Sequence, residues 1–361
     1  MFRFSDRALI LHDRPNFQKY ESLLKFISIS AMPNKFIVIT SINYPTKALH
    51  AFSQLQDWQV VVVADRKTPQ DWQLPNVKIL TIEEQETLPL QTVKWLRWNH
   101  YARKNLGYLY AIMNGAQLLY ETDDDNIPYD AWESLFPCNA EIEVKTSAKP
   151  AKFINTYQHF SDEHVWPRGF PLTEVLTQLS TTEMPKQAAN RIAPVQQGLA
   201  DLEPDVDAIY RLTIGKSITF AQNTPLYVAP GTYCPFNSQN TLWYPEAFPY
   251  LFLPASVPSR VTDIWRGYIA QRFLHLNHQG VLFCSPSVYQ ERNYHNLQHD
   301  FAEEIDLYTK TEQFISVLDA YDADYAGVMM YLLQHQFVQP EEIDLFKAWI
   351  HDLTQLGAIA S

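Results

Sequence analysis

Short apolar runs alternate with stretches of helical spacing in the first third of the chain. Residues 35–43 and 58–66 each hold a run of β-branched and aromatic residues bounded by polar ones, which predicts two buried parallel strands. Apolar positions in residues 46–57 recur at helical spacing, and a weaker strand is predicted at residues 77–81. This order is typical of a βαβ unit.

A second long pattern follows. Residues 91–115 have tryptophan, leucine and isoleucine in a helical rhythm, which predicts one long helix that ends at Gly115. The next strand, around residues 118–122, runs directly into the three aspartates of residues 123–125. In an α/β sheet the carboxyl ends of parallel strands are where ligands bind, so this strand end is the first candidate site.

The remainder of the chain predicts two further regions. Residues 136–260 are rich in proline, aromatic residues and short strand-like pieces, which indicates loops over the sheet edge and an antiparallel extension. From about residue 311 the apolar residues return to helical spacing, which predicts a C-terminal helical cap. We therefore expect an α/β fold with a mostly parallel sheet flanked by helices.

The net charge and the motifs that the sequence lacks exclude several classes of function. The 361 residues carry a formal net charge of −12, which argues against nucleic acid as a partner because that needs a basic surface. The ten glycines form no GxGxxG, Walker or GxSxG motif. The three cysteines, Cys138, Cys234 and Cys284, are far apart and form no CxxC, so we expect neither a zinc knuckle nor a disulfide framework.

The lengths of the apolar runs bear on the cellular location of the protein. The apolar stretch near the first residue is only about four residues long, short of the roughly 7 to 15 of a secretory signal. No apolar run approaches the roughly 20 residues that span a bilayer. We expect no signal peptide, no transmembrane segment and a reducing, cytoplasmic location.

The run Asp123, Asp124 and Asp125 is the most informative local feature. Two carboxylates at i and i+2 after a strand end can turn toward one divalent cation, and Mg²⁺ or Mn²⁺ prefers such oxygen ligands. Substrate phosphates usually complete the coordination of such an ion. The alternative is a solvated acidic turn, but the preceding apolar strand favours a metal site.

Three charged residues near this run are further candidates. Arg103 and Lys104 lie in the segment that leads to the aspartates and could hold a diphosphate, or could lie on an exposed helix face. Asp65, at the end of the second strand, could accept the N–H of a uracil or bind a ribose hydroxyl, or could cap the strand end.

Several longer motifs point to one family. The chain resembles the STELLO-type glycosyltransferases and, more distantly, the reversibly glycosylated polypeptides, whose members include UDP-arabinopyranose mutases. The matching stretches are ADRKTP (64–69), YARKNLGYLYAIMNGAQLLYETDDDN (101–126), WPRGFPL (166–172), QQGLADLEPDVDAIYRLT (196–213), PFNSQNTLW (235–243), RVTDIWRGYIAQR (260–272) and ERNYHN (291–296). Together they cover most of the chain in order.

The resemblance implies a GT-A-like fold, a UDP-sugar donor and a divalent cation, Mn²⁺ or Mg²⁺. It divides the chain into an N-terminal extension (1–34), a GT-A-like glycosyltransferase domain (35–310) and a C-terminal helical extension (311–361). Asp263 is then the catalytic candidate, as general base or as the group that binds the sugar hydroxyls. The metal ligands implied are Asp123, Asp125 and His295, and the residues for the donor are Thr40, Asp65, Arg103, Lys104, Asp123, Asp124, Arg168, Arg211 and Arg266.

Two other functions fit the same motifs. A mutase would release the diphosphate and return it to the same sugar with a changed ring size, without an external acceptor. A non-catalytic scaffold that organises glycosyltransferases would retain the fold alone. The expected partners of a transferase are a nucleotide sugar and a glycan or other hydroxyl acceptor, and inverting or retaining chemistry and homo-oligomerisation are left open.

Overall fold

The computed structural model describes residues 34–136, 142–146, 151–177, 186–189, 193–291 and 296–359. Residues 34–361 form one compact unit. The predicted boundaries at residues 34 and 310 stay predictions. Within the described residues, no helix is both long enough and apolar enough to cross a membrane.

One large mixed sheet organises the fold. Along it the strands follow the order β3-β2-β1-β4-β10-β8-β11-β9-β6-β7, and β5 pairs with β11. Its first four strands are parallel, and antiparallel pairs begin where β10 joins β4. The strands are β1 (Lys35–Ser41), β2 (Trp58–Ala64), β3 (Val77–Leu80), β4 (Leu118–Thr122), β5 (Asn126–Pro128), β6 (Ile142–Thr146), β7 (Lys186–Ala189), β8 (Val195–Asp201), β9 (Leu226–Val228), β10 (Asn240–Trp243) and β11 (Val281–Gln290).

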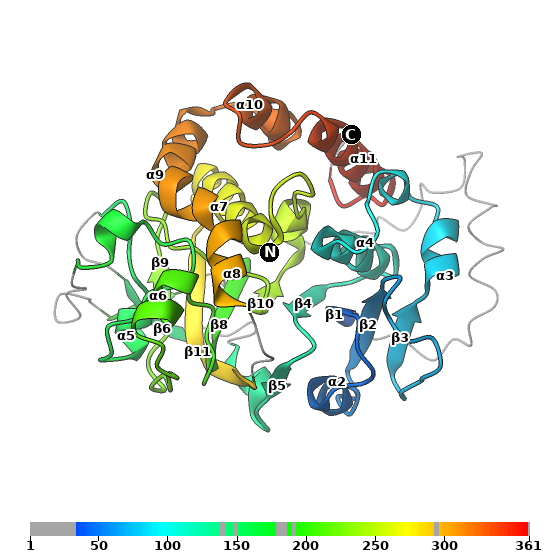
Figure 1. Cartoon of the computed structure of the whole chain (residues 1–361), viewed down its shortest axis with the longest axis horizontal. Helices are drawn as coiled ribbons and strands as arrows, with labels where there is room; N and C mark the ends of the chain where they lie inside the picture. Colours follow the sequence, from blue (N-terminus) through cyan, green and yellow to red (C-terminus); the bar gives the residue numbers. More distant parts are fainter. Residues whose placement is uncertain are drawn as a thin grey trace, which may run out of the picture. The chain divides into compact units, whose positions relative to one another are not determined.

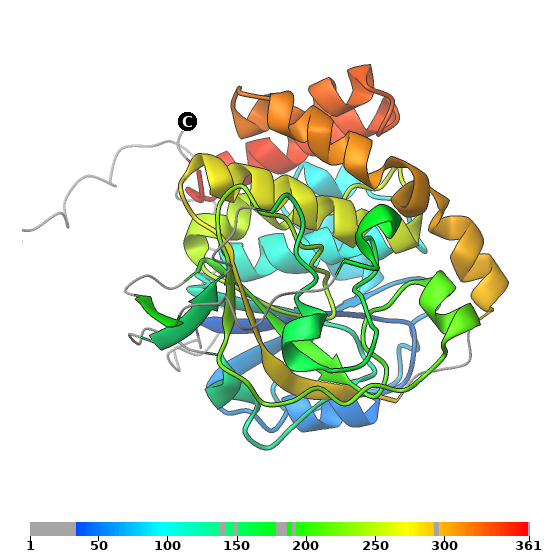
Figure 2. The same cartoon turned by 90° about the vertical axis from the view of Figure 1, so that its left-hand side faces the viewer.

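Helices cover both faces of this sheet. Helices α4 and α7 lie over one face and α2 lies over the other, while α9, α10 and α11 form an outer layer beyond α4 and α7 (Figures 1 and 2). The α-helices are α2 (Lys47–Phe52), α3 (Ile82–Thr87), α4 (Lys104–Met113), α5 (Tyr157–Phe160), α6 (Ala208–Thr213), α7 (Ser259–Leu276), α8 (Leu297–Glu303), α9 (Ile305–Ala320), α10 (Val328–Gln334) and α11 (Glu341–Gln355).

The core has two parts because side chains of a strand alternate between its faces. Phe36 and Val38 of β1 belong to the cluster that includes α4, α7 and the C-terminal helices. Ile37 and Ile39 belong to the cluster that includes α2. The run of apolar residues in β1 is therefore buried on both faces, as expected of a parallel strand between two helical layers.

The expected α/β class, the antiparallel extension and the C-terminal helical cap are confirmed. The predictions for β1, α2, β2, β3 and β4 are confirmed as well, with Thr46 as the N-cap of α2 and Gly115, at φ 83°, just after α4. The GT-A-like character of the layout stays a prediction. The two cysteines among the described residues, Cys234 and Cys284, are buried thiols, and Cys138 lies outside those residues.

The single helix predicted over residues 91–115 is wrong. Only α4 and two short 3₁₀ turns, Thr92–Lys94 and Tyr101–Arg103, are helical there. Asn99 has φ 54°, a left-handed conformation that no right-handed helix tolerates. The carboxylate of Asp65 holds this break because it accepts the backbone N–H groups of Asn99 (2.8 Å) and His100 (3.2 Å).

Helix α7 was not anticipated as a helix, and it carries the main catalytic candidate. It begins after Pro258, which suits a helix start because proline lacks the N–H that has no intrahelical partner there. Gly267 lies one turn beyond Asp263, and a Cβ at this glycine would lie 2.4 Å from the carbonyl oxygen of Phe236. This close approach brings Asp263 against the backbone that precedes β10.

Candidate functional site

A cavity of about 280 Å³ opens at the carboxyl end of β4. Its lining comes from seven separate parts of the sequence and includes three aspartates and three arginines. The lining residues are Tyr101, Asp123, Arg168, Asp205, Arg211, Ser238, Gln239, Ser259, Arg260, Asp263 and Gln290. Polar side chains of both signs thus surround one concave space, as in an enzyme site.

Asp123 is the member of the aspartate run that faces the cavity. One of its oxygens, Oδ1, accepts hydrogen bonds from the Tyr101 hydroxyl (2.9 Å) and from the Lys104 ammonium (3.2 Å). Lys104 is fully buried, and it also donates to the carbonyl oxygens of Thr122 (2.7 Å) and Ser238 (3.3 Å). Lys104 therefore holds the carboxylate of Asp123 in position, and it does not itself line the cavity.

The other two aspartates point to different partners. Asp124 accepts from the Ser41 hydroxyl and from the Asn43 side chain (3.0 Å), and so ties the run to the end of β1. Asp125 accepts from Gln290 through Oδ2 (2.8 Å), while its Oδ1 is buried and has no hydrogen-bond partner. Burial, and then the charge of Asp123, raise the pKa of Asp125 to about 7.

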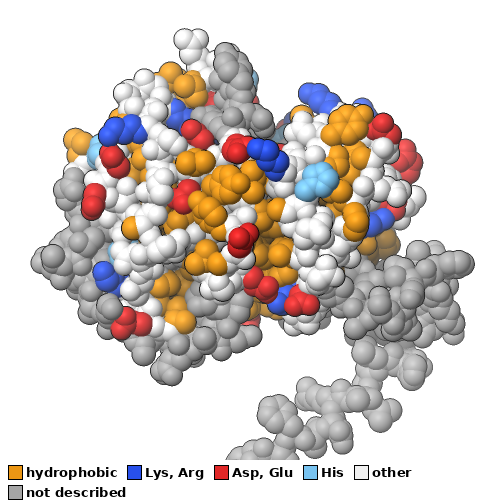
Figure 3. Space-filling view, turned by 90° about the horizontal axis from the view of Figure 1, so that it is seen from below, with side chains coloured by type: hydrophobic (Ala, Val, Ile, Leu, Met, Phe, Trp, Pro, Cys, Tyr) orange, Lys and Arg blue, Asp and Glu red, His pale blue; other side chains and the backbone are white. Residues whose placement is uncertain are grey.

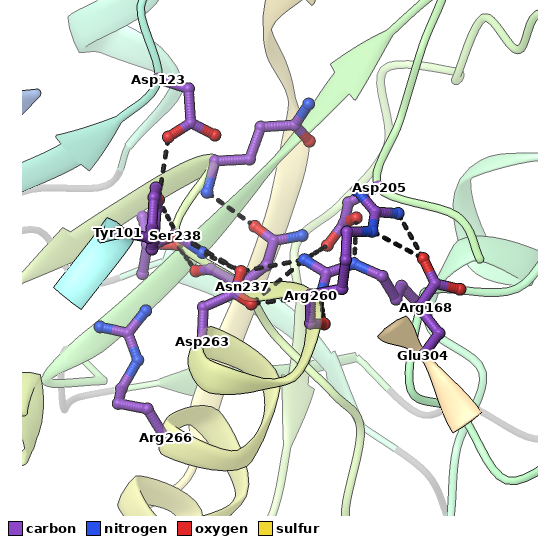
Figure 4. A network of polar contacts seen from close by, with 12 residues as sticks. Tyr101, Asp123, Arg168, Asp205, Asn237, Ser238, Arg260, Asp263, Arg266 and Glu304 are labelled. Atoms are coloured by element: carbon purple, nitrogen blue, oxygen red, sulfur yellow. Dashed lines mark hydrogen bonds and ion pairs between the residues drawn. The ribbon is translucent and has the colours of Figure 1, made fainter. Parts of the chain in front are cut away.

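Arg168 forms the centre of a polar network beside the aspartate run (Figure 4). Its guanidinium pairs with Asp205 through Nε (2.7 Å) and Nη2 (2.9 Å), and with Asp263 through Nη2 (3.0 Å) and Nη1 (3.2 Å). It also donates to the carbonyl oxygen of Arg260. All three charged side chains are at least nine-tenths buried, so each needs the others.

Asp263 lies inside α7 and does not cap it. Its Oδ2 accepts from the backbone N–H and the hydroxyl of Ser238, both at 3.3 Å. Burial alone would raise the pKa of Asp263, but the charges of Arg168 and Arg266 hold this pKa below its ordinary value. The Ser238 hydroxyl also contacts the Tyr101 hydroxyl at 2.5 Å, so the network runs from Asp263 to Asp123.

Three sequence motifs interlock through this network. In WPRGFPL, the Trp166 indole donates to Asp207 (2.7 Å), the N-cap of α6. Gly169 has φ 82°, and a Cβ there would lie 2.4 Å from the side chain of Ile264 in α7. Three motifs therefore pack against one another: those at 166–172, 196–213 and 260–272. This contact determines part of the residue types in each of them.

Arg211 and Arg260 complete the basic side of the cavity. Arg211 pairs with Glu203 and donates to the carbonyl oxygen of Pro204 (2.8 Å), and its Nε is buried without a partner. Arg260 pairs with Glu304, its Nε lying 2.8 Å from Oε1. Both side chains keep some exposure at the cavity, 12% for Arg211 and 21% for Arg260.

The other candidates for donor contacts lie elsewhere. Arg103 is buried, donates to Gln85 (3.0 Å from Nε) and stacks on the Trp98 ring at 3.4 Å. Arg266 is buried and forms an internal ion pair with Glu121 (2.7 Å).

Asp65 supports the loop before α4, where its carboxylate accepts the backbone N–H groups of Asn99 and His100. Thr40 is half-buried within β1 and does not line the cavity. His295 lies outside the described residues.

Several residues of the site were not among the sequence candidates. Tyr101, Asp205, Ser238, Arg260 and Gln290 line the cavity. All five belong to or border the quoted motifs, but their roles depend on contacts between distant segments. Asp205 had the strongest local signal, because it follows a proline in EPDVDA and precedes the N-cap of α6.

The residues at the aspartate run fit a divalent cation. Asp125 offers a buried carboxylate oxygen without a partner, and Asp123 offers a carboxylate at the cavity wall. Both are hard oxygen donors, which Mg²⁺ and Mn²⁺ prefer. Among the described residues, no group of three or more histidine, cysteine, aspartate or glutamate side chains forms a complete site, so substrate oxygens or water would complete this one.

Comparisons with known proteins find similarity to the STELLO glycosyltransferases. Residues 260–360 match the family model of STELLO glycosyltransferases. The chain is 29% identical over 347 residues to Probable glycosyltransferase STELLO1 of Arabidopsis thaliana, covering 90% of this chain and 44% of that protein. Against Probable glycosyltransferase STELLO2 of the same plant the identity is 28% over 352 residues, covering 90% of this chain and 45% of that protein.

These matches confirm the resemblance to the STELLO glycosyltransferases. The chain spans less than half the length of these curated relatives. A solved structure titled "Crystal Structure of a Mycobacterial Protein" matches 80% of this chain and 76% of its own at 9% identity, with a TM-score of 0.37. That likeness is too low to support an argument.

The buried clamp around Arg168 predicts a large effect of a conservative substitution. Arg168→Lys keeps the charge but cannot pair in parallel with two carboxylates, so we expect the free energy of unfolding to fall by on the order of 3 kcal/mol. Arg97→Lys is the matched control, because the Arg97–Glu341 pair is exposed and is worth less than about 1 kcal/mol. Urea unfolding measures both, and equal losses in the two variants would contradict this role of the clamp.

The pKa of Asp125 predicts a pH dependence of stability in the presence of a chelator. Because the folded protein raises this pKa from 3.8 to about 7, it retains a proton that the unfolded chain releases, and the free energy of unfolding falls as pH rises through that window. Asp125→Asn cannot ionise, so its free energy of unfolding should not show this fall. We therefore expect the free energy of unfolding of the variant, relative to that of the wild type, to be higher at pH 8 than at pH 4 by on the order of 1 kcal/mol. If urea unfolding gives the same difference at both pH values, the inferred environment of Asp125 is wrong.

Proposed function

We propose that this relative of the STELLO glycosyltransferases is a metal-dependent glycosyltransferase whose donor is a nucleotide sugar, a UDP-sugar, bound at the Asp123–Asp125 run. The family comparison supports the transfer of a sugar. The observation that carries the metal dependence is the buried, unpartnered oxygen of Asp125 beside a cavity that Asp123 lines.

The charge balance of the cavity supports the same proposal. Four cations, Lys104, Arg168, Arg211 and Arg260, line it or pair with its lining, against five carboxylates, Asp123, Asp205, Asp263, Glu203 and Glu304, so their net formal charge is −1. Asp125 adds negative charge beside it. An anionic diphosphate is repelled by such a cavity unless a cation accompanies it.

In this proposal Asp123 and Asp125 hold Mn²⁺ or Mg²⁺. The bound ion supplies Lewis-acid stabilisation of the charge that develops on the departing diphosphate. Arg211 and Arg260 are the arginines with part of their surface at the cavity, so we assign them, ahead of Arg103 and Arg266, to the anionic part of the donor. Lys104 acts through Asp123 by fixing its position.

The environment of Asp263 favours one of its two proposed roles. A general base works best when its pKa lies near the working pH, whereas here the pKa lies below the ordinary value of an aspartate. Its oxygens already accept from Arg168 and Ser238. We therefore assign Asp263 to shaping the cavity and contacting sugar hydroxyls, with no proton removed by it.

A panel of UDP-sugars tests the proposal. With Mn²⁺ we expect ³¹P NMR to show UDP released from one of them by transfer to water or an added hydroxyl acceptor, and no release in chelator. Asp125→Ala should abolish release, because it removes the unpaired metal-binding oxygen, whereas Asp130→Ala, at an exposed aspartate after β5, should release UDP like the wild type.

Two outcomes would contradict a transferase. An isomerised nucleotide sugar without released UDP would indicate a mutase. No reaction and no metal-dependent binding across the panel would indicate the scaffold.

A further inference from the structure

Two glutamines that were not among the candidate residues line the cavity next to the aspartate run. Gln290 donates from Nε2 to Oδ2 of Asp125 (2.8 Å), and Gln239 donates from Nε2 to Oε1 of Gln290 (2.9 Å). We propose that Gln290, held by Gln239, is the positioning residue of Asp125 and keeps its free oxygen, Oδ1, oriented for a divalent cation. This inference rests on the metal site of the proposed function.

Strand pairing determines where Gln290 lies. It is the last residue of β11, and it pairs with Asn126 in the antiparallel contact between β11 and β5. Asn126 directly follows Asp125, so the register of this short pairing sets the amide of Gln290 beside that carboxylate. A shift of one residue would turn the amide to the other face of the strand.

Gln239 is held in turn by the strand that ends in the aspartates. Its carbonyl oxygen accepts from the Thr122 hydroxyl (2.7 Å), and its N–H donates to the Asn237 side chain (3.0 Å). It precedes β10, whose first residue, Asn240, pairs with Thr122. The relay of two amides therefore connects β10 and β11 to the residue that precedes Asp123.

The chemistry of the partners orients both amides. A carboxylate at Asp125 only accepts, so Gln290 must present its NH₂ group there and its oxygen toward Gln239. Gln239 presents its own NH₂ group to that oxygen, so both contacts require the same orientation of Gln290. The relay ends on Oδ2 and leaves Oδ1 of Asp125 as the oxygen without a partner.

Such support is needed because Asp125 is close to two like charges. Asp123 and Asp124 directly precede it in the sequence, and Gln290 donates a hydrogen bond to its Oδ2. Partners of this kind, which orient a metal ligand without touching the metal, typically contribute about 10- to 100-fold to metal affinity.

A double-mutant cycle on Mn²⁺ binding tests the relay. Isothermal titration calorimetry would give the Kd for Mn²⁺ in the wild type, Gln290→Met, Gln239→Met and the double variant, because methionine keeps the volume and removes the amide. We expect Gln290→Met to raise the Kd by about 10-fold or more and Gln239→Met to raise it less. Since Gln239 acts only through Gln290, the double variant should match Gln290→Met alone.

Two reference variants separate the possible failures. Gln59→Met, at a half-buried glutamine of β2 that does not line the cavity, should bind Mn²⁺ like the wild type. Asp125→Ala should lose binding. If Asp125→Ala loses binding but Gln290→Met does not, or if the two glutamine effects multiply in the double variant, the relay is overturned and the metal site stands.

If Asp125→Ala binds Mn²⁺ like the wild type, the metal site itself is overturned. Thermal unfolding of each variant shows whether it is folded. If Gln290→Met does not fold, Gln239→Met still tests the relay, because an unchanged Kd for Mn²⁺ in that variant would overturn it.

Discussion

The site depends on one buried guanidinium. Arg168 lies between Asp205 and Asp263, and through them it joins the loop before α6 to the first turns of α7. Its two partners are 37 and 95 residues away in the sequence. A buried charge without partners costs several kcal/mol, so these three segments adopt this geometry together or not at all. The network in Figure 4 then extends from Asp263 through Ser238 and Tyr101 to Asp123.

The arginines of the cavity are largely committed to the protein's own carboxylates. Arg168 is shared by two aspartates, Arg211 pairs with Glu203, and Arg260 pairs with Glu304. This neutralisation lets charged side chains line a partly enclosed space, but it leaves no positive excess for an anionic ligand. Among the side chains described on the face in Figure 3, basic groups are likewise scattered among acidic ones. The aspartate run makes the net charge of the cavity negative. This negative charge is the physical reason why an anionic ligand needs a cation beside it.

The sequence predicts the parts of the fold that local pattern controls. Strand β1 is a run of apolar residues because both its faces are buried, and Asp123 follows the carboxyl end of β4, where the cavity opens. The break at Asn99 was not predictable, because the carboxylate that holds it belongs to Asp65, on another strand end. Nothing local in the helical rhythm of residues 91–115 marks that contact.

The same limit applies to the site. The aspartate run and Asp263 could be selected from motifs, but which arginines face the cavity could not, since Arg266 and Arg211 look alike in sequence. Glu121 removes Arg266 from the cavity, and this pairing across 145 positions exists only in the folded sheet. Gln290 gains its place from the register of β11 against β5, which no local pattern reveals.

Calorimetric titration of UDP into the protein, in Mn²⁺ and in chelator, tests most directly the claim that the cavity accepts a diphosphate only together with a cation. We expect UDP to bind in Mn²⁺ and to bind at least about tenfold more weakly in chelator, a difference of about 1.4 kcal/mol or more. Equal affinity in the two conditions would show that the arginines suffice to hold the diphosphate, and it would contradict a role of Asp123 and Asp125 as a metal site.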